Sequence, residues 1–133
     1  MGLPRRLFPE LAAIYLGGVI GALARVGLAE AFPHAVDSWP WPTFLVNVAG
    51  ALLLGFFYIT LEDRRAEGIR HPFLATGICG TLTTFSAMQL ELLKMIEAGE
   101  TGLAFAYLAA SLVLGYAALR CGMRAAFLRG VRS

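Results

Sequence analysis

The sequence has little charge and few residues of the kinds that bind metals or act as nucleophiles. Only 15% of its 133 residues are charged, and it contains two histidines and two cysteines. Cys79 and Cys121 lie in different apolar segments without redox or metal-binding spacing, so we interpret both as small buried residues. The net charge of +2 is small and dispersed, which argues against a nucleic-acid partner.

Hydrophobic residues, by contrast, make up 58% of the chain, and its mean hydropathy is +0.68. A soluble domain has about 45–50% apolar and about 25% charged residues. The excess is grouped in four segments, each close to the roughly 20 residues that a helix needs to cross a bilayer. We therefore expect an all-α membrane protein, not an enzyme, in which residues 1–133 form a single four-helix transmembrane domain. The expected spans are about 11–31, 43–61, 73–96 and 103–128.

The third expected span is a poor candidate for a continuous helix. It contains Gly77 and Gly80, followed closely by the hydroxyl residues Thr81, Thr83, Thr84 and Ser86. One interpretation is a helix broken at mid-membrane, where freed carbonyl groups can coordinate a cation. The other is a kinked but continuous helix whose hydroxyls bond back to the preceding turn. The sequence leaves both open.

Neutral polar side chains also lie inside the other spans, where they are costly and often functional. Asn47 is the only asparagine, and it either joins two helices by a hydrogen bond or donates its amide N–H to a solute. Phe85 and Met88 share a helix face that Glu91 continues towards the mouth of a pathway, and Tyr107 and Ser111 begin a stripe that reaches Gly115.

Small residues in the first two spans favour close helix packing. Gly17 and Gly21 form one small-residue pair, and Ala51 and Gly55 form another. Arg25 lies one turn beyond Gly21. We expect its guanidinium either to reach the membrane interface or to bind carbonyl groups at the C-terminus of a helix.

No acidic residue lies in the middle of a span, although Glu30 and Glu91 lie near span ends. A proton-coupled transporter needs a titratable group within the membrane, so this absence argues against a small multidrug exporter, the alternative from another class. A pathway of N–H and O–H donors, with the positive edges of aromatic rings, suits a small anion.

Four passages together resemble the CrcB/Fluc fluoride ion channel family: Gly17–Arg25, Pro42–Gly50, Gly77–Ser86 and the stripe of Tyr107 and Ser111. The resemblance implies a passive channel in the bacterial inner membrane that exports cytoplasmic fluoride down its gradient and so lowers its toxicity. It also implies a dual-topology, antiparallel dimer with two pores. The implied pore residues are Asn47, Thr84, Phe85, Ser86, Met88, Tyr107 and Ser111, with Arg25 and Glu91 at the mouth or in structural roles.

The resemblance further implies a structural Na⁺ at the dimer interface, held by backbone carbonyls of Gly80 and Thr83 from both subunits. Three positions depart from the family pattern. Met88 replaces a second phenylalanine, Gly115 stands where a hydroxyl is common, and Thr81 replaces a glycine.

Charge distribution leaves the dimer's composition open. The arginines of both termini and of residues 64–70 fall on one side of a four-span protein, which predicts cytoplasmic termini. An antiparallel homodimer needs a chain that inserts both ways. We therefore expect a homodimer, and keep as the alternative a non-conducting or half-functional subunit of a heterodimer.

Overall fold

The computed structural model describes residues 5, 7–62 and 68–130, and all regular structure in these ranges is helical. Four helical segments are long and apolar enough to cross a membrane: Leu7–Ala31, Trp41–Leu61, Pro72–Glu97 and Thr101–Gly130. The expected all-α architecture with four spans is thus confirmed. Every segment extends past its expected range at one end or both. Prolines at residues 9, 42 and 72 do not prevent this, because they lie in first turns, where a backbone N–H has no helical partner.

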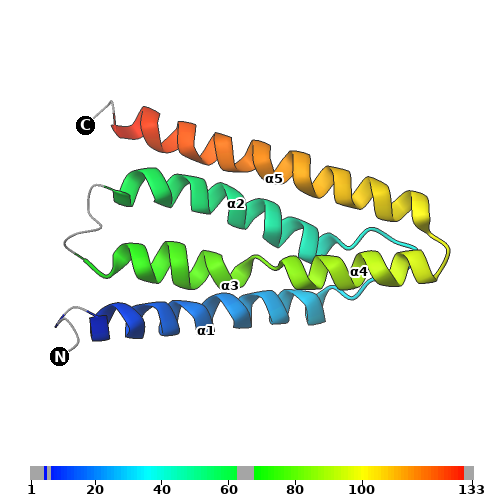
Figure 1. The fold of residues 1–133 in the computed structure, drawn as a ribbon, viewed down its shortest axis with the longest axis horizontal. Helices are drawn as coiled ribbons and strands as arrows, with labels where there is room; N and C mark the ends of the chain where they lie inside the picture. The colour runs from blue at the N-terminus through cyan, green and yellow to red at the C-terminus, as the bar shows by residue number, and fades with distance from the viewer. Residues whose placement is uncertain (1–4, 6, 63–67, 131–133) are drawn as a thin grey trace.

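The segments lie side by side as a bundle, with α1 (Leu7–Ala31) and α5 (Thr101–Gly130) on its two flanks in Figure 1. Between them lie α2 (Trp41–Glu62) and the third span, which consists of the π-helical η1 (Pro72–Cys79), α3 (Gly80–Leu82) and α4 (Phe85–Glu97). Consecutive spans run in opposite directions. The start of α1 and the end of α5 therefore lie at the same end of the bundle.

Two pairs of helices approach closely because glycines face each other's backbones. On α1, a Cβ added to Gly17 would collide with the carbonyl oxygen of Phe73, and one added to Gly21 would collide with Thr81 and the Ile78 carbonyl. On α2, a Cβ at Gly55 would collide with the Leu119 carbonyl of α5. The packing role predicted for Gly17, Gly21 and Gly55 is confirmed.

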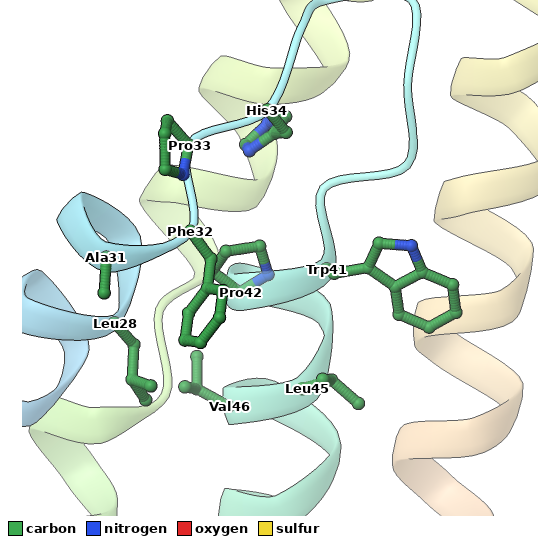
Figure 2. A pocket seen from close by; sticks show the side chains of 9 residues that line it. All are labelled: Leu28, Ala31, Phe32, Pro33, His34, Trp41, Pro42, Leu45 and Val46. Carbon is green, nitrogen blue, oxygen red and sulfur yellow. The ribbon is translucent and has the colours of Figure 1, made fainter.

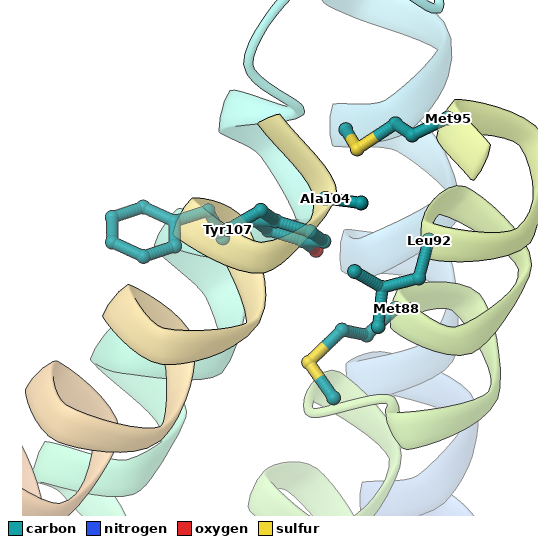
Figure 3. Packing of buried hydrophobic residues seen from close by; sticks show 6 residues of the cluster. Met88, Leu92, Met95, Ala104 and Tyr107 are labelled. Carbon is teal, nitrogen blue, oxygen red and sulfur yellow. The ribbon is translucent and has the colours of Figure 1, made fainter. Parts of the chain in front are cut away.

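A buried hydrophobic cluster lies near the connection between α1 and α2, and consists of Phe44, Met88, Leu92, Met95, Ala104 and Tyr107. Figure 3 shows Met88, Leu92 and Met95 of α4 directed towards Ala104 and Tyr107 of α5. The ring of Trp39 packs edge-on against Phe44 and Tyr107, with centroid distances of 5.3 and 5.6 Å. This cluster joins the third span to α2 and α5.

The two cysteines lie in different environments. Cys79 is buried, as expected, but Cys121 is exposed. The expectation for Cys121 was wrong because hydropathy does not tell which side of an apolar helix faces its neighbours. Cys121 precedes Gly122, which forms the actual contact with α2, against the Leu52 carbonyl.

Candidate functional site

The helical hydrogen-bonding pattern of the third span is interrupted after Leu82. Thr83 has an extended backbone (φ −74°, ψ 145°), as does Thr84 (φ −147°, ψ 111°), and α4 begins at Phe85. Figure 1 shows this interruption between α3 and α4. Backbone groups at such a point need other partners, because lipid offers none.

Asn47 of α2 supplies two of these partners. Its Oδ1 accepts a hydrogen bond from the Thr84 backbone N–H at 2.7 Å, and its Nδ2 donates to the Thr84 carbonyl at 3.2 Å. The asparagine thus joins two helical segments, as one of the two interpretations of its role required. An asparagine amide has two N–H donors. Among the residues that the structure describes, only one of them is used.

The hydroxyls beside the interruption divide into two groups. Those of Thr81 and Thr83 donate back into the preceding turn or to α1: Thr83 Oγ1 lies 2.9 Å from the Cys79 carbonyl, and Thr81 Oγ1 lies 2.9 Å from the Gly77 and Gly18 carbonyls. Those of Thr84 and Ser86 lie 3.2 Å from each other, and Thr84 Oγ1 also accepts the N–H of Ala87. Thr84 therefore caps α4. Ser86 is exposed on the surface of the chain.

Gly80 and Thr83 are among the residues at the interruption whose carbonyl groups lose the N–H that a continuous helix would provide. The Thr84 N–H, four residues beyond Gly80, donates to Asn47. The Ala87 N–H, four residues beyond Thr83, donates to the Thr84 hydroxyl. Gly80 is exposed, and a Cβ added to it would meet open space. Such carbonyl oxygens are suitable ligands for an alkali cation.

Arg25 binds the same region from α1. Its Nε donates to the Thr81 carbonyl at 3.2 Å. The sequence allowed this side chain either to reach the membrane interface or to bind carbonyl groups at the C-terminus of a helix. The structure shows the second role, because Thr81 lies near the C-terminus of α3. The guanidinium group of Arg25 thus lies at the C-terminal, negative end of that short helix, where a positive charge is favourable.

Phe85 and Met88 are three residues apart on α4 but have opposite environments. Phe85 is 67% exposed, whereas Met88 is 5% exposed and belongs to the buried cluster. Residues three apart on a helix differ by about 60° in direction, so the edge of a packed face can pass between them. In this chain the two side chains therefore do not line a common surface.

Glu91 of α4 is the centre of a polar cluster with residues of α2, α5 and the connection between α1 and α2. Its Oε1 accepts from the Thr43 hydroxyl and its Oε2 from the Tyr107 hydroxyl, each at 2.7 Å. His34 Nε2 lies 3.8 Å from Oε1. The Tyr107 side chain is fully buried, and its hydroxyl proton is directed to the carboxylate.

Ser111 lies one turn beyond Tyr107 on α5. Its Oγ is buried and has no hydrogen-bond partner among the described residues, a property that it shares with Trp39 Nε1. A buried hydroxyl without a partner is destabilising, so such a group is a candidate for binding a solute.

Sequence reasoning missed Thr43 and His34. Thr43 precedes Asn47 by one helical turn, so its spacing could have identified it as a neighbour on the same face. His34 gave no such signal, because its contact with Glu91 joins the connection between α1 and α2 to a residue of α4 that is distant in the sequence.

His34 also borders a cavity of about 600 Å³ between the end of α1 and the start of α2 (Figure 2). The other residues around this cavity are apolar or aromatic: Leu28, Ala31, Phe32, Pro33, Trp41, Pro42, Leu45 and Val46.

Comparisons with known proteins identify relatives over most of the chain. The family model described as CrcB-like protein, Camphor Resistance (CrcB), matches residues 12–123. The Fluoride-specific ion channel FluC 1 of Mycobacterium bovis is 48% identical over 118 residues, which cover 88% of this chain and 89% of that protein. The Fluoride-specific ion channel FluC of Hyphomonas neptunium is 42% identical over 113 residues (83% and 89%), and that of Bacteroides fragilis is 34% identical over 117 residues (85% and 92%).

Proposed function

This chain belongs to the CrcB-like protein family, and we propose that it is a fluoride-selective ion channel through which cytoplasmic fluoride leaves passively, down its electrochemical gradient. It is a multi-pass protein of the bacterial membrane and an ion channel rather than an enzyme. Export of fluoride lowers its toxicity in the cytoplasm, and the bacterial inner membrane is where such a channel has to act.

The observation that carries this proposal is the set of uncharged donors around the interruption, in a chain whose relatives are named as fluoride channels. These donors are the second amide N–H of Asn47 and the hydroxyls of Thr84 and Ser86, and the buried Ser111 hydroxyl on α5 is a further uncharged donor. Fluoride is a small, strong hydrogen-bond acceptor. Neutral donors replace its water without the tight binding that a fixed cation would cause.

Phe85 supports a pathway between two copies of the chain. An aromatic ring that is 67% exposed beside the interruption is available to a second subunit, and its positive edge attracts an anion. In the proposed antiparallel dimer, the exposed Phe85 of each subunit faces the partner, while the buried Met88 and Tyr107 support the wall from inside. A homodimer is the simplest arrangement of this kind.

A structural Na⁺ fits the backbone at the interruption. The carbonyls of Gly80 and Thr83 lack their helical N–H partners, and Gly80 is open to an approaching subunit. In an antiparallel dimer, two such pairs of oxygens would hold the ion by its preference for oxygen ligands and fix the two interruptions against each other. Arg25, bound to the Thr81 carbonyl, would stabilise the same turn.

Glu91 is compatible with an anion pathway because both of its oxygens are occupied. Thr43 and Tyr107 donate to them from two different helices. These bonds disperse the negative charge of the Glu91 carboxylate and hold the carboxylate towards α2 and α5. In this role Glu91 and Tyr107 position the pathway wall near its mouth, and Ser111 continues the donors towards the interruption.

A second candidate function is a half-functional subunit of a heterodimeric channel. Met88 favours it, because its side chain is 5% exposed and has no ring edge to offer an anion. Gly115 also favours the heterodimer, because it continues the stripe of Tyr107 and Ser111 without a hydroxyl, and a Cβ added there would meet open space. A partner chain would then supply the missing pore groups.

The test is ion efflux from liposomes that contain only this purified chain. We expect release of fluoride, measured with a fluoride electrode, and no release of chloride under the same gradient. Equal chloride efflux would contradict selectivity. Absence of fluoride efflux from a folded protein would favour the heterodimer.

A further inference from the structure

Gln89 is an exposed polar residue of α4, within the third membrane-spanning segment. It follows Phe85 by four residues, so the two side chains leave the helix on the same face. Leu92 and Ile96 continue this stripe at helical spacing. Among the described residues, Gln89 has no hydrogen-bond partner. Neither the pore residues expected from the sequence nor the proposed donors include it.

Gln89 lies well inside the span rather than at its end. The interruption at Thr83 and Thr84 is near the middle of the segment Pro72–Glu97. At about 1.5 Å per residue, Gln89 is about 8 Å beyond Thr84 and about 12 Å before the end of α4. The Cα–Cβ bonds of a helix tilt towards its N-terminus, which in α4 is the interruption, so this carboxamide is not carried towards water. A polar group left unpaired in hydrocarbon is costly, and Gln89 therefore needs a partner from outside the chain.

A groove between α4 and α5 borders Gln89. It has a volume of about 330 Å³, and the other described residues that line it are apolar. On α4 they are Leu92, Leu93 and Ile96, and on α5 they are Ala104, Phe105 and Leu108. Among these lining residues, the carboxamide of Gln89 is therefore the one side chain that can form a hydrogen bond with a solute in the groove.

The wall that α5 contributes continues towards Ser111, which follows Leu108 by three residues and so shares its helix face. The helices α4 and α5 are antiparallel and joined by a short turn, so depth can be counted from that turn (Figure 1). Gln89 is about 12 Å from the end of α4, and Ser111 is about 15 Å from the start of α5. The Ser111 hydroxyl is buried and has no partner among the described residues. Two neutral donors without partners thus lie at nearly the same depth of the bundle.

The carboxylate of Glu91 lies on a different side of α4 from Gln89. Residues two apart on a helix differ by about 160° in direction. The oxygens of Glu91 accept hydrogen bonds from Thr43 and Tyr107, which hold the carboxylate away from the groove. The ring of Phe85, by contrast, is 67% exposed on the same stripe as Gln89. N–H donors and an aromatic edge on one stripe, with this carboxylate turned away, are complementary to a small anion.

We propose that Gln89 is a further fluoride-binding residue of the ion pathway, one helical turn from Phe85 in the direction of Glu91. Its Nε2 has two N–H groups, and one of them donates to the ion in the groove. A second copy of the chain covers the open side of the groove, as it covers Phe85 in the proposed dimer. This inference rests on the proposed function, because it assigns a donor to the same pathway.

Fluoride efflux from liposomes that contain the purified full chain tests the inference. Q89L keeps the approximate size of the side chain but removes its donors, and we expect roughly tenfold slower efflux. Q89N keeps the carboxamide and should slow efflux by at most about threefold, whereas Q89E adds a negative charge and should slow it more than Q89L. The matched control is L90A, at an exposed neighbouring residue that does not line the groove, and it should change efflux by less than about twofold.

The oligomeric state, measured by single-molecule photobleaching of the labelled chain in membranes, separates ion binding from a role in assembly. We expect Q89L to form dimers in the same proportion as the wild type. Fewer dimers in Q89L, restored in Q89N, would mean that Gln89 bonds to the second copy and would overturn the inference. Efflux through Q89L at the wild-type rate, or an equal loss in L90A, would also overturn it and leave the proposed function intact. Absence of fluoride efflux from the wild type would overturn the proposed function and this inference with it.

Discussion

Asn47 and Thr84 are joined by two hydrogen bonds in opposite directions, one to each backbone group of Thr84. The amide thereby replaces helical partners at the point where α3 and α4 separate, and it links this point to α2. A single side chain thus stabilises the interruption and keeps a second N–H that has no partner among the described residues.

Replacement of Asn47 by aspartate tests both roles. The carboxylate can still accept the Thr84 N–H, but it cannot donate to the Thr84 carbonyl, and its charge repels an anion. We expect N47D to reduce fluoride efflux from liposomes to the level of protein-free vesicles. The control T60A removes an exposed hydroxyl that bonds only within α2, to Phe56, and should conduct normally. Fluoride efflux through N47D at the wild-type rate would show that Asn47 does not line the proposed pathway.

Loss of the Tyr107 hydroxyl should destabilise the subunit while preserving its ring contacts. In Y107F one oxygen of Glu91 loses its partner, and a hydrogen bond to a charged group contributes about 1.5–3 kcal/mol. Unfolding in detergent, followed by tryptophan fluorescence, measures this. E91Q combined with Y107F should cost less than the sum of the two single variants. Y116F, which removes an exposed hydroxyl, is the control, and strict additivity would contradict the coupling.

Two glycines of α1 provide a matched pair for testing helix packing. A Cβ at Gly21 would collide with Thr81 and the Ile78 carbonyl, whereas a Cβ at Gly27 would meet open space. We expect G21A to lower the free energy of unfolding by roughly 1–3 kcal/mol, and G27A to leave it unchanged or slightly raised. Equal stability of the two variants would show that α1 does not pack closely on the third span.

Replacement of Ser111 by alanine should reduce fluoride transport without reducing the stability of the protein. Its buried hydroxyl has no partner among the described residues, so S111A should not lower the free energy of unfolding. Fluoride efflux should nevertheless fall, because one donor of the proposed pathway is removed. S38A, in the connection before α2, is the control for transport. A loss of more than about 1 kcal/mol in S111A would indicate a structural partner instead.

Much of the fold could be predicted from hydropathy. Four predominantly apolar segments of sufficient length predicted four spans, because a bilayer requires long apolar helices. Arg25 could be placed only as one of two alternatives, since a flexible side chain can reach either solvent or a neighbouring helix. The opposite environments of Phe85 and Met88 could not be predicted, because in a membrane both the lipid-facing and the protein-facing sides of a helix are apolar.

The amino-acid sequence by itself determined which segments cross the membrane, where close packing is encoded by glycine, and which neutral polar residues lie within the spans. Tertiary structure alone decided which of those polar groups are already satisfied. Glu91 takes the protons of Thr43 and Tyr107, and Asn47 pairs with Thr84, while Ser111 remains without a partner among the described residues. The physical reason is that a hydrogen bond depends on distance and direction between atoms on different helices, which no local pattern of residues contains.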